Sequence, residues 1–200
     1  MKRRKDFVKM IGVLDLQGGV IEHLSHLKSL GVNGRRVKKP QDIAGLSGLI
    51  IPGGESTCIS KLINIFGLHK AITEEFNCGM KIWGTCAGAI LLAKNIAGET
   101  PHLALMDIEI KRNGFGSQLD SFGLHVIIKP ISPRPIPLTF IRAPKITRVG
   151  SDVNILLRID DYVAVAETPG ALATVFHPEL TADLSFHRYF LKKCGREIIQ

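Results

Sequence analysis

The sequence is poor in aromatic residues, cysteines and long apolar segments, and each shortage excludes a class of protein. Aromatic residues are 6% of the 200 residues, too few to form a stacking platform for nucleic acid. The four cysteines contain no C-x-x-C pair, which argues against a disulfide framework. No apolar run approaches the roughly 20 residues that a membrane-spanning helix needs. We therefore expect a cytoplasmic protein with reduced thiols and no membrane segment.

Positive charge is in excess, but it is concentrated. The formal net charge is +8, with one basic cluster in residues 1–9 and another in residues 35–39. No zinc finger, RNA-binding aromatic motif or basic helix accompanies these clusters, so we expect no nucleic-acid partner. Nor do His, Cys and carboxylate residues show the spacing of metal ligands, so we expect no metal. We interpret residues 1–9 as a solvated basic tail and residues 10–200 as one domain.

The composition and the first half of the chain predict an α/β fold. Apolar residues are 45% and charged residues 22% of the chain, close to the globular average. Short apolar runs that end at glycine or proline alternate with stretches of helical periodicity, which indicates crossover connections and a mostly parallel sheet. The predicted strands are 10–16, 32–37, 48–51 and 80–83, and the predicted helices are 20–30, 56–66 and 68–76.

The second half changes to short β-type runs separated by proline and glycine turns. These predicted strands are 106–110, 124–128, 153–159, 163–166 and 173–176, and a closing helix is predicted over 184–193. The proline cluster at 130–137 cannot form a central strand, so we interpret it as a loop or a sheet edge.

The most distinctive local pattern is G-x-C-x-G around Cys86. It follows the strand predicted to end at Trp83 and precedes a helical run over 89–94. This is the arrangement of a nucleophile elbow, in which a strained turn presents the nucleophile and small neighbours let strand and helix pass closely. The pattern predicts a nucleophilic Cys86. A glycine-rich turn around a buried structural cysteine is the alternative interpretation.

A cysteine nucleophile needs a base, and the base needs a group that orients it. His177 and Glu179 form an H-P-E sequence after the apolar run 171–176. At the mouth of a parallel sheet, we expect His177 to reach Cys86 and Glu179 to hold the second imidazole nitrogen. The other histidines show no comparable partner and are interpreted as structural or exposed; they are His23, His26, His69, His102, His125 and His187.

A glycine pair, Gly53 and Gly54, follows another predicted strand in the segment 51–57. Two glycines allow the backbone to direct its amides toward one point, which suits a developing oxyanion. The spaced glycines and the lysine of a Walker P-loop are missing. A plain β-turn with Ser56 capping a helix is the alternative.

Together these segments resemble the class I glutamine amidotransferases, the triad-type cysteine glutaminases, and more narrowly the glutaminase subunits of pyridoxal 5′-phosphate synthase. The G-T-C-A-G and H-P-E segments are shared by the wider class, whereas P-G-G-E-S-T, R-N-x-F-G and F-I-R-A-P narrow the resemblance. Ser117 and Gly123 stand where the family usually has Arg and Glu. The matching segments follow the family order over nearly the whole chain: 16–18, 22–23, 52–57, 84–88, 111–116, 121–122, 140–144 and 177–181.

The resemblance implies a single-domain, three-layer sandwich around a mostly parallel sheet. It also implies hydrolysis of L-glutamine to L-glutamate and ammonia through a glutamyl thioester. In this scheme Cys86 is the nucleophile, His177 the acid and base, and Glu179 the group that orients His177. Backbone N–H groups of Gly54 and Ala87 form the oxyanion hole. The implied substrate-binding residues are Gly54, Glu55, Ser56, Arg112, Ile141 and Arg142.

The resemblance also implies a partner. A separate synthase subunit condenses the ammonia with ribose 5-phosphate and glyceraldehyde 3-phosphate in a hetero-oligomer, and the glutaminase itself carries no cofactor. Two alternatives remain open at this stage. One is a glutaminase subunit of another synthase, such as that of histidine biosynthesis. The other is a catalytically silent binding subunit.

Overall fold

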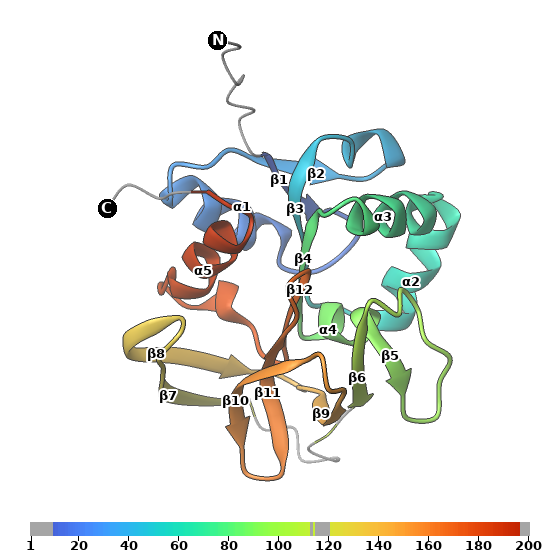
Figure 1. The fold of residues 1–200 in the computed structure, drawn as a ribbon. Helices are drawn as coiled ribbons and strands as arrows, with labels where there is room; N and C mark the ends of the chain where they lie inside the picture. The colour runs from blue at the N-terminus through green and yellow to red at the C-terminus, as the bar shows by residue number, and fades with distance from the viewer. Residues whose placement is uncertain (1–9, 113, 115–120, 197–200) are drawn as a thin grey trace.

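The computed structural model describes residues 10–112, 114 and 121–196. It contains a central sheet with helices on both faces (Figure 1). The expected basic tail at residues 1–9 and Ser117, where the family usually has Arg, lie outside the described residues. The helices are α1 (Val20–Ser29), α2 (Ser56–Ile65), α3 (Leu68–Asn77), α4 (Ala87–Leu92) and α5 (Ser185–Lys193), with short 3-10 turns at Pro40–Asp42 (η1) and Pro178–Leu180 (η2). The strands are β1 (Met10–Leu14), β2 (Gly34–Val37), β3 (Leu46–Ile51), β4 (Lys81–Thr85), β5 (Ala93–Ile96), β6 (Met106–Lys111), β7 (Phe122–Ile128), β8 (Ser132–Phe140), β9 (Lys145–Val149), β10 (Asn154–Ile159), β11 (Tyr162–Glu167) and β12 (Ala171–Thr174).

The first half of the main sheet is parallel, in the order β2-β1-β3-β4-β12. Its central strands are buried on both faces, which explains why they are continuous apolar runs rather than alternating ones. Beyond β12 the order continues β11-β9-β6-β5 with mostly antiparallel pairing, and β10 also pairs with β11. The predicted α/β fold with a mostly parallel sheet is confirmed.

Helices cover both faces of the parallel strands and complete three layers. Figure 1 shows α1 and α5 on one side of the sheet and α2 and α3 on the other. Trp83, at the centre of β4, is fully buried and contacts Phe186 and Phe190 of α5. One apolar core therefore joins the last helix to the middle of the sheet.

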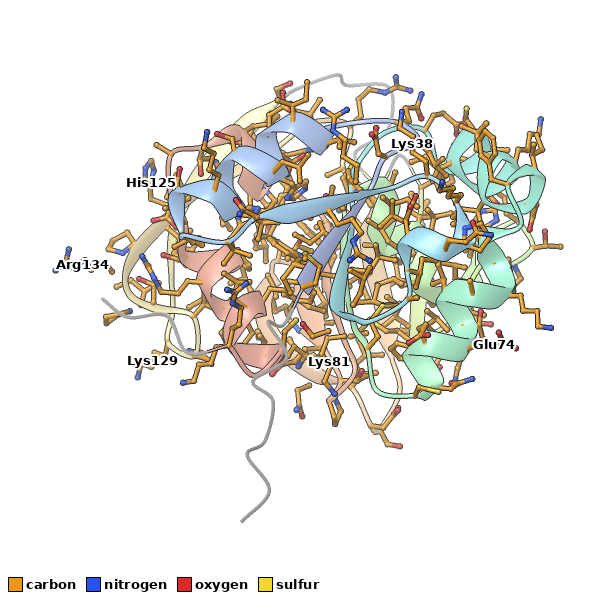
Figure 2. The ribbon with its side chains drawn as sticks, turned by 90° about the horizontal axis from the view of Figure 1, so that it is seen from above. Lys38, Glu74, Lys81, His125, Lys129 and Arg134 are labelled. Carbon is orange, nitrogen blue, oxygen red and sulfur yellow. The ribbon has the colours of Figure 1, made fainter. Side chains whose placement is uncertain are left out.

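The proline-rich segment forms β8, which pairs with β7 in a separate two-stranded sheet. Pro133, Pro135 and Pro137 recur at every second position, so their missing N–H groups fall on the same edge of the strand. Because β8 pairs on one side only, this edge needs no donors, and the prolines also discourage further pairing. The sheet-edge interpretation is confirmed. Figure 2 shows His125, Lys129 and Arg134 pointing outward at this hairpin, away from Glu74 on the opposite side.

Two local predictions were wrong, and one strand was not predicted. The helix expected over 89–94 ends at Leu92, and the chain continues as strand β5. The side chain of Glu55, rather than that of Ser56, caps α2 by accepting hydrogen bonds from the backbone N–H groups of Thr57 and Cys58. Strand β9 was not predicted, because its burial alternates irregularly and it carries polar residues. None of the described helices is long and apolar enough to cross a membrane.

Candidate active site

The carboxyl ends of β3, β4 and β12 open into one cavity of about 360 Å³. This edge of a parallel sheet is where ligands commonly bind, and the volume is of the order of known small-molecule pockets. All of the implied site residues except Glu179 line the cavity, and Glu179 lies behind His177. The full lining is Gln17, Gly54, Glu55, Ser56, Cys86, Ala87, Ile90, Arg112, Ile141, Arg142, Pro144 and His177.

Cys86 stands between β4 and α4 in a strained turn, with φ 49° and ψ −106°. A positive φ is uncommon for a residue other than glycine and clusters at functional sites. The Cys86 N–H donates to the carbonyl of Thr174 at the end of β12, at 2.8 Å. A side chain at Gly84 would collide with the backbone of Gly88. The flanking glycines thus allow the close strand–helix passage that a nucleophile elbow requires.

His177 reaches the cavity from the segment that follows β12. Its N–H donates to the carbonyl of Thr139 in β8 at 2.9 Å, which fixes the backbone beside the cavity. The η2 turn then places Glu179 so that the His177 Nδ1–H donates to Glu179 Oε1 at 2.8 Å. The Glu179 side chain is only 1% exposed. Cys86 and His177 thus face one cavity, with the carboxylate on the far side of the imidazole.

The electrostatics favour a protonated His177. Burial of the ring opposes protonation, but hydrogen bonds and negative charge from Cys86 and Glu179 outweigh it and raise the pKa of His177 to about 10. Burial also raises the pKa of Glu179, but the hydrogen bond from His177 and the nearby His23 and His177 rings lower it on balance. This arrangement suits an imidazolium beside a cysteine nucleophile.

The glycine pair after β3 forms another wall of the cavity. A side chain at Gly53 would collide with the His177 ring and press on Cys86 Cβ. Gly54 has φ +146°, a conformation that residues with side chains rarely adopt. The Glu55 N–H donates to Gln17 Oε1 at 2.9 Å, so Gln17 holds this loop from the β1 side.

Glu55 and Arg112 lie together at the rim of the cavity. Arg112 Nη2 donates to Glu55 Oε1 at 2.8 Å, and Arg112 Nη1 donates to Glu99 Oε1 at 2.6 Å. Burial raises the pKa of Glu55, but hydrogen bonds from Cys58 and Thr57 and the charge of Arg112 lower it on balance. Both signs of charge are therefore present at one end of the cavity.

Two further features offer groups to a ligand. Ser56 Oγ is buried and has no hydrogen-bond partner among the described residues. Arg142 is exposed and has φ 47°, a second strained backbone position at the cavity, next to Ile141.

Sequence reasoning missed several residues at or beside the cavity. Gln17, Ile90 and Pro144 line it, although Gln17 and Pro144 lie inside the motifs quoted above. His23, interpreted as having no comparable partner, is fully buried with its Nε2 3.5 Å from Glu179 Oε2. Two signals were available: His23 belongs to the matching segment 22–23, and its spacing places it on the buried face of α1 with Val20 and Leu27.

Replacing Glu179 by glutamine is expected to reduce stability in a pH-dependent way. A histidine whose pKa rises from 6.5 to about 10 on folding stabilises the fold fully below pH 6.5, and this contribution is lost as pH rises through 10. The free energy of unfolding of wild type should therefore exceed that of Glu179→Gln at pH 7, and the gap should narrow by pH 10. Urea unfolding at both pH values measures it.

The control for this comparison is Glu74→Gln, because the Glu74 side chain is 63% exposed in an i,i+4 pair with Lys70. Its free energy of unfolding should stay within about 0.5 kcal/mol of wild type at both pH values. A constant difference between wild type and Glu179→Gln from pH 7 to pH 10 would contradict the His177–Glu179 coupling.

Comparison with solved structures gives the class first. A crystal structure described as a glutamine amidotransferase matches with a TM-score of 0.88 and 41% sequence identity, over 93% of this chain and 99% of the other. A PurLQS structure from Thermotoga maritima matches with a TM-score of 0.67 at 16% identity, over 92% of this chain and 97% of the other. The second likeness is one of fold alone. The fold is that of the glutamine amidotransferases.

The particular family follows from the sequence. A model of the SNO glutamine amidotransferase family matches residues 13–196. A protein of Syntrophus aciditrophicus called pyridoxal 5′-phosphate synthase subunit PdxT is 63% identical over 185 residues, 92% of this chain and 83% of that protein. A protein of the same name from Clostridium beijerinckii is 50% identical over 91% of this chain and 96% of its own length. The chain belongs to the SNO glutamine amidotransferase family.

Proposed function

We propose that this chain is the glutaminase subunit of a pyridoxal 5′-phosphate synthase, and that Cys86, His177 and Glu179 form its catalytic triad. One observation carries the proposal: the 2.8 Å hydrogen bond from His177 to a buried Glu179, next to the strained Cys86 in a shared cavity. The family description supports glutamine chemistry, and the names of the relatives support the same synthase.

The first half of the reaction breaks the side-chain amide of L-glutamine. The Cys86 thiolate attacks the amide carbonyl carbon and forms a C–S bond. Backbone N–H groups of Gly54 and Ala87 stabilise the negative charge that develops on the carbonyl oxygen. His177, protonated because of its raised pKa, gives its proton to the leaving nitrogen. Ammonia departs and a glutamyl thioester remains on Cys86.

The second half releases glutamate. His177, now neutral, removes a proton from a water molecule, which attacks the thioester carbonyl. The C–S bond breaks, the electron pair returns to sulfur, and the Cys86 thiolate and the protonated His177 are restored. Glu179 keeps its proton-free carboxylate throughout, holds Nδ1 and stabilises the imidazolium.

Substrate recognition is proposed to use the rim of the cavity. The α-amino and α-carboxylate groups of glutamine need opposite charges nearby, and Glu55, Arg112 and Arg142 supply both signs. Ser56 and the backbone at Gly54 and Ile141 complete the proposed contacts. Since Glu55 and Arg112 already pair with each other, a bound zwitterion would extend this ion pair rather than create one.

We further propose that the ammonia passes to a separate synthase subunit in a hetero-oligomer, within a reducing cytoplasm. The structure joins none of the four cysteines in a disulfide, and reduced cysteines suit such a compartment. The functional unit is proposed to be the domain over residues 10–200.

The proposed function predicts partner-dependent glutamate release. Purified chain is incubated with L-glutamine alone and with the cognate synthase subunit, and glutamate is quantified. Turnover should rise when the synthase is added. Absence of glutamate under both conditions, with complex formation verified, would favour a silent binding subunit. Stimulation by a histidine-biosynthesis synthase instead would favour the other-synthase alternative.

A further inference from the structure

Three histidines lie behind the proposed triad, on the side of Glu179 away from His177. His23 Nε2 lies 3.5 Å from Glu179 Oε2, His23 Nδ1 lies 2.9 Å from His187 Nε2, and His187 Nδ1 lies 3.2 Å from His26 Nδ1. His23 and His187 are fully buried, whereas His26 is partly exposed. The contacts thus form a continuous line from the surface of α1 to the carboxylate.

The carboxylate of Glu179 needs a second partner. Oε1 accepts the hydrogen bond from His177, but Oε2 and His23 Nε2 are buried atoms with no hydrogen-bond partner among the described residues. They face each other at a distance slightly longer than an ordinary hydrogen bond. Such contacts are often long in structures without substrate and shorten in the reacting complex. A carboxylate held at both oxygens cannot rotate away from the imidazole.

One arrangement of protons gives the Glu179 carboxylate a donor and satisfies both contacts between the rings. A neutral imidazole has one N–H and one lone pair, and burial lowers the pKa of His23 to about 4 and that of His187 well below its usual value. Glu179 only accepts, so His23 must carry its proton on Nε2. His23 Nδ1 then accepts from the His187 Nε2–H, and His187 Nδ1 accepts from the His26 Nδ1–H.

The opposite arrangement would set the lone pair of His23 Nε2 against a buried carboxylate oxygen, which is unfavourable. The surroundings keep the inner rings neutral, because Trp83 packs edge-on against both His23 and His187. The charged and titratable groups that face the line are Glu179 and His177 at its inner end and Asp183 near His26, whose ring also hydrogen-bonds to the Thr181 backbone. The three rings bond in series instead of converging on one point, and no metal-binding group occurs in the part of the chain that the structure describes.

We propose that His23 is a positioning residue for the triad. Its Nε2–H holds the second oxygen of Glu179, and His187 and His26 keep His23 in the tautomer that can do so. The inference rests on the proposed function only for the expected fall in kcat for glutamine. The positions of Glu179 and His177 and the reactivity of Cys86 can be measured without glutamine.

The test compares His23→Leu, His23→Gln and Phe190→Leu with wild type. Leucine removes both polar contacts, whereas glutamine can donate to Glu179 and accept from His187. Phe190 is fully buried, packs on the same Trp83 and lies on the same helix as His187, so its variant controls for loss of core packing. Urea unfolding of each variant establishes that the compared proteins are folded.

The first readout is the rate at which iodoacetamide alkylates Cys86 at pH 7, followed by peptide mass spectrometry. His23→Leu should slow it by about tenfold or more, by analogy with the 10- to 100-fold effect of partners that orient metal-bound histidines. His23→Gln and Phe190→Leu should stay within a few-fold of wild type. In the complex with the synthase subunit, His23→Leu should lower kcat for glutamine by a similar factor while KM changes little.

The second readout is ¹⁵N NMR of the wild-type histidines, which distinguishes protonated from unprotonated ring nitrogens. His23 and His187 should each carry the proton on Nε2 and remain neutral at pH 6. A proton on His23 Nδ1 would overturn the proposal, as would equal losses in His23→Leu and Phe190→Leu, or failure of His23→Gln to restore Cys86 reactivity. If wild type hydrolysed no glutamine, the proposed function would fall, while alkylation and NMR would still decide the role of His23.

Discussion

Replacing Cys86 by alanine is expected to remove glutamine hydrolysis in the presence of the synthase subunit, with kcat falling by about 10⁴-fold or more, as for other covalent nucleophiles. In the proposed mechanism no other residue that lines the cavity can take its place, because Cys86 is the only cysteine among them and the thioester forms on its sulfur. Alanine keeps the Cβ and the backbone hydrogen bonds of residue 86, so the fold should persist. Glutamate release is measured by a coupled assay, and glutamine binding by calorimetry.

The matched control is Cys78→Ala, because Cys78 is an exposed free thiol at the end of α3. It should keep wild-type turnover and stability. Cys86→Ala should still bind glutamine, with an affinity close to that of wild type before the covalent step, since Glu55 and Arg112 at the rim of the cavity are untouched. Residual turnover of Cys86→Ala above a tenth of wild type would refute the nucleophile assignment.

Replacing Gly88 by alanine should damage both stability and activity, although helix propensity alone predicts the opposite. Alanine in place of glycine inside a helix is worth up to about 1 kcal/mol of stabilisation. At Gly88, however, the new Cβ would lie 2.9 Å from the carbonyl carbon of Ile51 and closer still to its oxygen. The neighbour is backbone at the end of β3, which cannot rotate aside. The free energy of unfolding should fall by about 1–3 kcal/mol, the usual cost of overpacking.

The activity should fall further than the stability implies. Relief of the clash requires α4 to move away from β3, and this shifts Cys86 and Ala87 relative to Gly54 and His177. A displacement of about 1 Å at reacting groups can cost on the order of 100-fold in rate. Urea unfolding and kcat are measured on the same preparation. Gly123→Ala is the control, because a Cβ there meets only an ordinary contact at 3.8 Å and needs no unusual backbone; Gly88→Ala as stable and active as this control would contradict the argument.

The parallel half of the fold was predictable because each strand there is buried on both faces. Runs such as 48–51 stand out in the sequence, and the glycines after them mark the turns. The elbow at Cys86 and the H-P-E segment at His177 were predictable for a related reason, since their chemistry demands particular residue types at fixed spacing. The resemblance to a family then supplied Glu55, Arg112 and Arg142, which no local pattern would have selected.

What could not be predicted depends on contacts between distant parts of the chain. Glu55 caps α2 although Ser56, a commoner capping residue, follows it directly, and the Glu55 carboxylate also pairs with the distant Arg112. Strand β9 exists because β6 and β11 lie on either side of it. The contact between His23 and Glu179 joins α1 to η2, and the two residues are more than 150 positions apart in the sequence. The contact between His23 and His187 spans a similar separation.

During synthesis, β12 is the last of the described strands to leave the ribosome, yet it belongs between β4 and β11 in the middle of the sheet. Until it is inserted, the nascent chain lacks the proposed pairing of Cys86 with His177, because His177 follows closely after β12. Such a late, non-local strand pairing is a slow folding event, and β4 offers an open edge to misassembly while it waits. The proposed triad can therefore be complete only after the last of the described strands has joined the sheet.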